Sequence, residues 1–445
     1  MDAWTVLVFL LAATAAGPLN AAVYSWAWNS RRLSAWQPTP EGVARRTWAD
    51  CLPIIGWLRL RRDAPVLGRG FWVRPMLVEI GFGLAIAALW WWEVDRFGLF
   101  ASQAPGAFDP APLLSAAIAG FVLHAVLAWL MLVGSLIDID EKTIPDEVTV
   151  PGTLLGLLLA TLLPMGLLPN AEDRVGAPPV GTAVVSPEGR SLIGPFGGPL
   201  WLEPTHLAAP NDWPDALAGG AGNHQALLLG IGCYLFWCFA LTNRIWRGRR
   251  GFFFGLAVLL RRVIRDLQTR PLREILVAGV LAIAMVWFSG GAAWQGLLSA
   301  LVGMVVSGSL VWAVRLVGSA ALGKEAMGFG DVTLMMMIGA FLGWQAGLIT
   351  FFLAPFAGLL VGILQLLLRR GAEIPYGPFL CLAASFVVVR WADVWGRGES
   401  LFALGAVVPA VLVVCLALLG VLLAAWRWFK TRVLGVSEDW VEEDE

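Results

Sequence analysis

Long apolar runs separated by short polar stretches recur along the whole chain. The runs occupy residues 4–26, 76–92, 113–137, 148–168, 224–241, 275–288, 294–317, 332–342, 345–368, 379–394 and 401–426. A helix needs about 20 mainly apolar residues to cross a bilayer core of roughly 30 Å, and most of these runs approach that length. The pattern predicts an all-α fold, a polytopic membrane helix bundle of about 9–11 spans. The run 332–342 is the shortest of the candidates.

Arginine and lysine concentrate in the segments 27–75 and 242–274, and again after residues 368 and 426. Cytosolic loops of membrane proteins carry an excess of these residues. All four regions fall on the cytosolic side if the N-terminus is outside and the C-terminus is cytosolic. The acidic segment 169–223, rich in Pro and Gly, then falls on the opposite side and is expected to be a large, irregular extracytoplasmic insertion.

Composition agrees with a membrane protein and narrows its chemistry. Hydrophobic residues make up 58% of the chain and charged residues 14%, whereas a soluble domain carries about a quarter charged residues. The formal net charge of -1 argues against a nucleic-acid partner, which would require a basic excess. The five cysteines are scattered without a CxxC pair and predict small core residues rather than disulfides or metal ligands.

Two segments break the apolar pattern with acidic residues at helix ends. Asp138 directly follows the third run, and Asp331 ends the sequence Gly-Phe-Gly-Asp just before an apolar run. The predicted topology places both at the cytosolic membrane boundary, where two carboxyl groups could meet and share one proton. One would then take a proton from water and the other would polarise a carbonyl group. Gly328 and Gly330 would allow close approach of another chain.

Plainer explanations of these acids remain open at this point. Both aspartates could be ordinary loop acids at helix ends, since a motif as short as GxGD often occurs by chance. A divalent-metal site at the cluster Asp140, Glu141, Asp146 and Glu147 would need a defined ligand spacing, which the cluster lacks. A transporter would usually place ionisable groups deep in its spans, where this chain has little beyond Glu79 and His124.

Several segments, in the same order along the chain, resemble those of the prepilin peptidases. These proteins, also called type IV leader peptidases, are GxGD intramembrane aspartyl proteases. The resemblance is strongest over 325–344, which contains the GxGD motif, and extends to the segment from Asp138 to Ile144-Pro145-Asp146. The segment 374–380 resembles the stretch that follows the GxGD helices in that family. Residues 17–20 and 74–79 resemble its opening domain.

The resemblance implies an aspartic-type endopeptidase, a hydrolase of type IV pilus assembly and protein secretion. It would cut the leader of type IV prepilins or pseudopilins at the cytosolic face of the bacterial inner (cell) membrane. The implied catalytic residues are Asp138 and Asp331, with Gly328, Gly330, Pro145 and Asp146 supporting the site. The implied partners are prepilin N-terminal segments and the lipid bilayer. Proteolysis would need no cofactor, while many members also use S-adenosylmethionine to methylate the new N-terminus.

The chain departs from the family pattern in three places. The loop 29–74 contains only Cys51, which excludes the zinc site that two CxxC pairs form in many members. The segment 169–290 is expected to be an insertion of an extracytoplasmic loop, two spans and a basic cytosolic segment, and 401–445 an added span with an acidic tail. The remaining divisions are 1–110 (N-terminal spans with the basic cytosolic loop), 111–168 (first aspartate span pair) and 291–400 (GxGD catalytic helices).

Three other classes compete with this interpretation. Presenilin-like proteases also use GxGD but would show a Tyr-Asp pair and a later Pro-Ala-Leu motif, and neither occurs here. A catalytically inactive relative acting as a membrane assembly factor is the second alternative, and a transporter is the third. The sequence leaves the oligomeric state open.

Overall fold

The computed structural model describes residues 3–99, 110–173, 182–183, 200–204, 214–220, 222–242, 261–262, 264–266, 269–367 and 375–432. The longer helices are α1 (Ala3–Trp26), α4 (Val73–Trp90), α5 (Pro110–Glu141), α6 (Asp146–Leu162), α7 (His224–Ala240), α9 (Arg270–Ser289), α10 (Gly291–Leu322), α11 (Phe329–Leu342), α12 (Trp344–Leu367), α13 (Gly377–Val389), α14 (Trp391–Phe402) and α15 (Val407–Arg432). Short helical segments are η1 (Trp48–Cys51), α2 (Ile55–Leu60), η2 (Arg61–Asp63), α3 (Ala64–Leu67), the π-helical η3 (Trp91–Asp95), η4 (Pro164–Gly166) and η5 (Asp215–Leu217).

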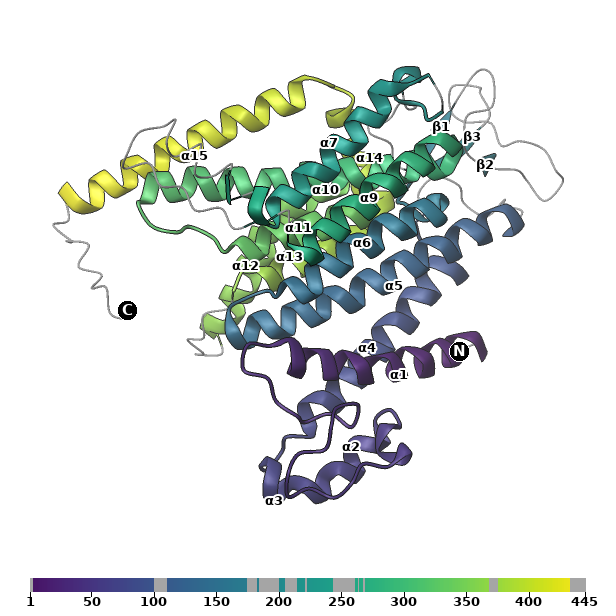
Figure 1. Ribbon diagram of the computed structural model, residues 1–445, viewed down its shortest axis with the longest axis vertical. Helices are drawn as coiled ribbons and strands as arrows, with labels where there is room; N and C mark the ends of the chain where they lie inside the picture. The colour runs from purple at the N-terminus through teal and green to yellow at the C-terminus, as the bar shows by residue number, and fades with distance from the viewer. Residues whose placement is uncertain are drawn as a thin grey trace.

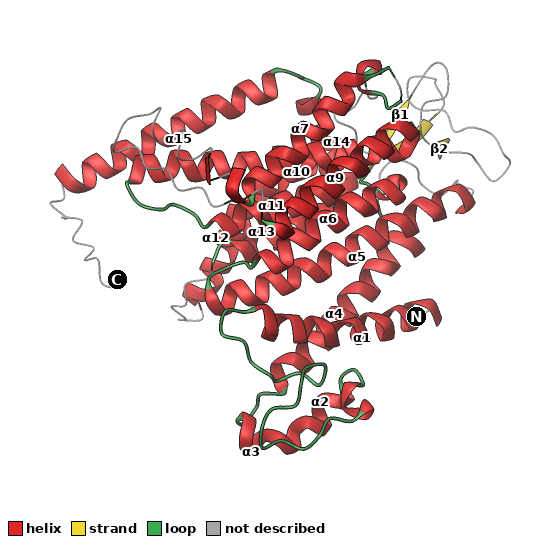
Figure 2. Ribbon diagram, viewed as in Figure 1, coloured by secondary structure: helices red, strands yellow, loops and turns green. Residues whose placement is uncertain are grey.

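Helices dominate the described part of the chain, and the predicted all-α membrane bundle is confirmed (Figure 2). Seven of these helices are long and apolar enough to cross a membrane, or eight if α13 and α14 form one span. A helix lies within every one of the predicted runs, but α6 and α7 have 17 residues each and α11 has 14. The predicted run 379–394 contains a bend of 94° between α13 and α14. The protein is therefore a multi-pass membrane protein.

The predicted extracytoplasmic segment 169–223 contributes a small antiparallel sheet. Its strands β1 (Pro169–Asp173), β2 (Thr182–Ala183) and β3 (Leu200–Pro204) have the order β1-β3-β2. The rest of 174–213 lies outside the described residues, as does most of the predicted basic segment that follows α7. The acidic tail after residue 432 also lies outside them.

The long helices run side by side, with α1 at one edge of the bundle and α15 at the other (Figure 1). The start of α1 and the small sheet lie at one end of the bundle, and the end of α15 lies at the opposite end (Figure 1). At the end of the bundle where α15 ends, contacts join segments that are far apart in the sequence. Arg74 at the start of α4 pairs with Asp140 near the end of α5. The Glu141 carboxylate accepts the backbone N–H groups of Trp28 and Asn29, which follow α1. The segment that follows α1 and the start of α4 therefore meet the end of α5 at this end of the bundle.

The centre of the bundle is the packing of α11 against α10 and α6. Every residue of α11 from Asp331 to Leu342 is buried. Gly303 of α10 and Gly339 of α11 lie so close that a Cβ on either would collide with the carbonyl oxygen of the other. Small residues at such crossings let two membrane helices approach closely, because lipid offers no hydrophobic driving force between them. This crossing fixes the position of α11 along the bundle axis, and therefore the position of Asp331 at the start of α11.

Two buried acids of the bundle, Glu93 and Glu79, have polar partners. His124 Nδ1 lies 2.8 Å from Glu93 Oε1, and both residues are almost fully buried. Glu79 accepts hydrogen bonds from the Ile54 N–H and from the Trp57 indole N–H. Glu79 thus ties α4 to the loop segment between α1 and α4.

A network of ion pairs holds the loop between α1 and α4 together. Asp50 is buried and accepts the backbone N–H and hydroxyl of Thr47, and it pairs with Arg59 and Arg62. Arg46 pairs with the buried Asp63 in the same loop. Burial alone would raise the pKa of Asp50, but the hydrogen bonds from Thr47, Arg62 and Arg59 outweigh it and lower the pKa to about 2. These contacts connect residues 46–63 of the loop with one another.

Replacing Asp50 by asparagine is expected to destabilise this loop by about 1–2 kcal/mol at neutral pH, since the lost hydrogen bonds are to charged groups that solvent partly screens. The pKa of Asp50 is depressed on folding, so its contribution is complete above the unfolded value of about 3.9 and disappears as pH falls towards 2. Limited proteolysis of the loop against pH measures this effect. Glu41→Gln, at an exposed position in the same loop, is the control. Equal protease sensitivity of wild type and Asp50→Asn at neutral pH would contradict the prediction.

Candidate aspartyl site

Asp138 lies in the last turn of α5 and is 4% exposed. The helix ends because Lys142 takes a left-handed conformation with φ 56°, while its N–H donates to the Asp138 carbonyl at 2.8 Å. Pro145 then caps the start of α6 in an extended conformation. The apolar run therefore carries Asp138 to the end of its span and turns back directly after it.

Asp331 lies in the first turn of α11 and is 8% exposed. α10 ends at Gly323, which has a φ of +73° and caps the helix in the left-handed conformation. Gly328 is the N-cap of α11, and the Thr333 hydroxyl donates to the Gly330 carbonyl at 3.0 Å. The loop between α10 and α11 thus presents Asp331 at the same end of the bundle as Asp138.

Both carboxyl groups line one partly open cavity of about 530 Å³. Three inter-helix segments surround it, one from each of the turns α5–α6, α10–α11 and α12–α13. The lining residues are Asp138, Lys142, Thr143, Ile144, Ala326, Met327, Gly328, Phe329, Gly330, Asp331, Pro375 and Tyr376. The fold therefore brings together two acids that are 193 positions apart in the sequence.

Two glycines allow the three segments to approach this closely. A Cβ at Gly377, the first residue of α13, would lie 2.5 Å from Asp138 Oδ2. A Cβ at Gly330 would lie 3.0 Å from the Ile144 Cβ. Asp138 Oδ2 is buried without a hydrogen bond of normal geometry among the described residues, although the Gly377 amide interacts with the carboxylate. An oxygen in this state can accept a proton, or a hydrogen bond from a water molecule.

The structure separates the predicted site residues into two groups. Asp138, Asp331, Gly328 and Gly330 all line the cavity. Pro145 and Asp146 do not line it; they begin α6, and their neighbour Ile144 contributes to the wall instead.

Sequence reasoning assigned no role to several residues of the α5–α6 and α12–α13 turns. Lys142, Thr143, Pro375, Tyr376 and Gly377 all lie at the cavity. The signal that could have found the last three is their place in the segment 374–380, which the sequence had already singled out. Nothing in the sequence indicated that this segment reaches Asp138.

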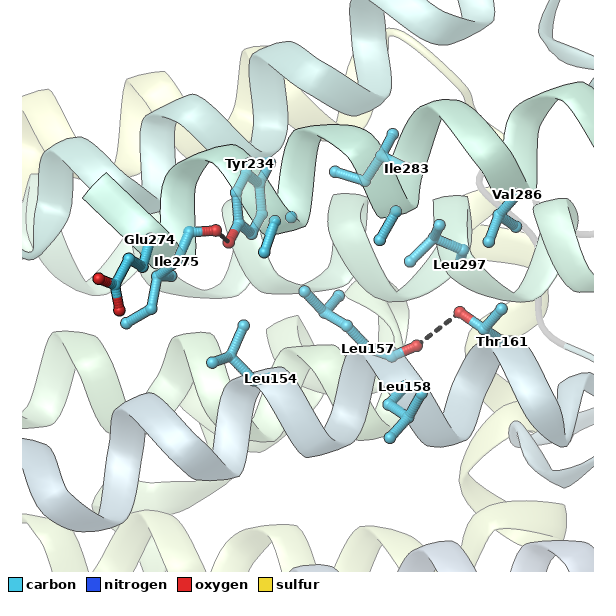
Figure 3. Close-up of a pocket in the computed structure, with 13 residues that line it drawn as sticks. Leu154, Leu157, Leu158, Thr161, Tyr234, Glu274, Ile275, Ile283, Val286 and Leu297 are labelled. Atoms are coloured by element: carbon cyan, nitrogen blue, oxygen red, sulfur yellow. Dashed lines mark hydrogen bonds between the residues drawn. The ribbon is translucent and has the colours of Figure 1, made fainter. Parts of the chain in front are cut away.

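Other cavities of similar size lie away from the aspartates and are almost entirely apolar. Figure 3 shows one of about 500 Å³ between α6, α7, α9 and α10, lined by side chains such as Leu154, Leu157 and Ile283. Its polar groups are few: Tyr234 donates to the Ile275 carbonyl at 2.7 Å, and Glu274 lies at its edge. Two further cavities have similarly apolar linings. Of these four cavities, the aspartyl cavity alone combines acidic groups with a loop boundary.

Residues 125–180 and 253–363 match the model of the type IV leader peptidase family. The chain is similar to this family over these two segments. The first matched segment contains Asp138, and the second contains Asp331. The family match leaves α7, within 181–252, and α15 outside, whereas α9 lies inside it. It does not decide whether the predicted insertion extends to residue 290.

Curated relatives support this similarity. A prepilin leader peptidase/N-methyltransferase of Aeromonas hydrophila is 34% identical over 148 residues, which cover 31% of this chain and 49% of the relative. One of Pseudomonas aeruginosa is 32% identical over 175 residues, covering 38% of this chain and 56% of the relative. The chain thus spans about half the length of these relatives. No solved structure matches the chain.

Proposed function

We propose that the protein is an intramembrane aspartyl endopeptidase that removes the leader of type IV prepilins or pseudopilins, with Asp138 and Asp331 as its catalytic pair. The observation that carries this proposal is the single cavity that both buried carboxyl groups line. Similarity to the family supplies the substrate class, since the curated relatives are named prepilin leader peptidases.

The chemistry follows from two carboxyl groups that share one proton. The ionised group takes a proton from a water molecule, and the resulting hydroxide attacks the scissile carbonyl carbon. The protonated group donates to the carbonyl oxygen as negative charge develops there. The two groups exchange roles when the amine leaves, so the pair titrates as a unit.

The orientation proposed is an extracytoplasmic N-terminus and a cytosolic aspartyl cavity. The end of α1, which leads into the Arg-rich loop, the basic end of α15 and the cavity lie at the same end of the bundle. The positive-inside rule favours that end as the cytosolic one. The apolar helix of a substrate would then lie in the bilayer, with its scissile bond at the membrane boundary beside the cavity.

Proteolysis by this pair needs no cofactor. The relatives' names also include N-methyltransferase, an activity that uses S-adenosylmethionine in many family members. The three cavities away from the aspartates are apolar and do not suit the charged amino-acid part of that group. We therefore derive no methyl-transfer step from them.

A cleavage assay tests the proposal directly. The protein is reconstituted in liposomes with a prepilin from the same genome, and the new N-terminus is identified by mass spectrometry. We expect one cut at the border of the apolar segment, inhibited when both aspartates are replaced by asparagine. If the wild type leaves every prepilin and pseudopilin intact, the inactive-relative hypothesis replaces this one.

A further inference from the structure

The loop that presents Asp331 is held by side chains from one face of α10. The Arg315 Nε donates to the Met327 carbonyl at 2.9 Å, and another guanidinium nitrogen pairs with Glu325. The same guanidinium lies 5.6 Å from the ring centroid of Phe329. One residue outside the cavity thus contacts three positions of the loop 323–329. A charge-assisted hydrogen bond to a loop carbonyl is stronger than a neutral one and fixes direction as well as distance.

An aromatic cluster connects this loop with α7. Phe329, inside the GxGD motif, packs edge-on against Trp312 with ring centroids 5.6 Å apart. Trp312 in turn packs against Phe236 and Phe239 of α7, with centroids 5.5 and 5.9 Å apart. Aromatic pairs of this geometry stabilise the packed arrangement beyond the burial of their surfaces.

A second contact connects the start of the loop with α15. The Arg427 guanidinium packs against Gly323, where it would collide with any added Cβ. Two turns before Arg427, Gly420 of α15 lies against Val317 of α10. α7 and α15 both lie outside the family match. α15 contacts the start of the loop at Gly323, and α7 contacts Trp312, which packs on Phe329 at the end of the loop.

We propose that α7 and α15 brace the active-site loop 323–329, and that Arg315 is the positioning residue between these braces. The inference rests on the proposed protease function and assigns a role to regions that the family match does not cover. Arg315 does not line the cavity, so it acts through the loop rather than on the substrate. A displacement of about 1 Å at a reacting group can lower a rate about 100-fold, which makes the position of this loop critical.

The test compares Arg315→Gln, Trp312→Leu and Arg427→Gln with Arg432→Gln, a control at an exposed position of α15. We expect Arg315→Gln to lower kcat at least tenfold with KM changed less than threefold, because the substrate surface is intact. Arg315→Lys should restore part of kcat, since an ammonium group can still donate to the Met327 carbonyl but lacks the planar fork. Trp312→Leu and Arg427→Gln should each lower kcat several-fold, and Arg432→Gln should not.

Hydrogen–deuterium exchange of the full chain in lipid gives a second readout that needs no activity. The amides of 323–330 should exchange faster in the three variants, with α10 and the rest of α11 unchanged. Faster exchange throughout both helices would mean a general structural role and would overturn the proposal. Unchanged exchange and unchanged kcat would also overturn it. If the wild type proves inactive, the proposed function fails, while exchange still decides whether the braces hold the loop.

Discussion

Replacing Asp138 or Asp331 by asparagine is expected to lower the cleavage rate by at least about 1,000-fold, because each carboxyl group has a role that an amide cannot perform. An amide neither takes a proton from water nor donates one to the leaving amine. Since the two residues act as a unit, the double variant should be about as slow as either single variant. Single-turnover cleavage in liposomes measures all three rates, with membrane insertion checked for each protein.

The chain offers a closely matched control for this experiment. Asp140 lies two residues after Asp138 on the same helix end, but it is exposed and pairs with Arg74. Asp140→Asn removes an equal charge from the membrane boundary and loses at most about 1 kcal/mol of a solvent-screened ion pair. Its cleavage rate should stay within about threefold of the wild type. A loss in Asp140→Asn as large as in Asp138→Asn would mean that charge at this boundary, rather than the proposed pair, drives cleavage.

Much of the fold could be predicted because the membrane imposes a simple rule on sequence. Side chains that face the bilayer must be apolar, so the apolar runs of the sequence predicted the long helices of the bundle from α1 to α15. The number of full-length spans could not be predicted this way. α11 has only 14 residues, and its side chains from Asp331 onward are buried against helices such as α10 and α6 rather than exposed to lipid. Its run looked short for this reason.

Bends and loops depend on contacts that a periodic pattern does not contain. The run 379–394 was continuous in hydropathy, yet the helix axis turns sharply at Arg390. The loop between α1 and α4 carries many arginines, which indicated its side of the membrane but not its fold. Its order comes from buried acids such as Asp50 and Asp63, whose partners lie up to 17 positions away.

The candidate site was predictable where residues of unusual type interrupt an apolar run. Asp138 and Asp331 could be named because a carboxyl group at the edge of a span is costly and invites a functional explanation. Pro145 and Asp146 were grouped with them on resemblance, but the cavity wall is formed by Ile144 beside them. Arg315 could not be found from the sequence, because an arginine near a span end is common and only the folded loop gives it partners.

Gly377 provides the second large expected effect. Gly377→Ala places a Cβ 2.5 Å from Asp138 Oδ2 and 2.9 Å from the Ile144 Cδ1, so the carboxyl group or α13 must move. Both distances are shorter than van der Waals contact, so at least one of these two side chains must shift. Burial and packing surround Asp138, so we expect its carboxyl group to rotate away from Asp331. A shift of about 1 Å at a reacting group predicts a loss of cleavage of about 100-fold.

A glycine in open space and a double variant separate this collision from a general effect of added methyl groups. Gly396→Ala in α14 meets nothing within 4 Å and should leave the cleavage rate unchanged while slightly favouring the helix. Ile144→Ala removes the contact with Ile144 but not the one with Asp138, so it should not rescue Gly377→Ala. Recovery of cleavage in Gly377→Ala/Ile144→Ala would show that pressure on the α5–α6 turn, not the displaced carboxyl group, causes the loss. Activity of Gly377→Ala close to wild type would show that the close approach of α13 to Asp138 is not required for cleavage.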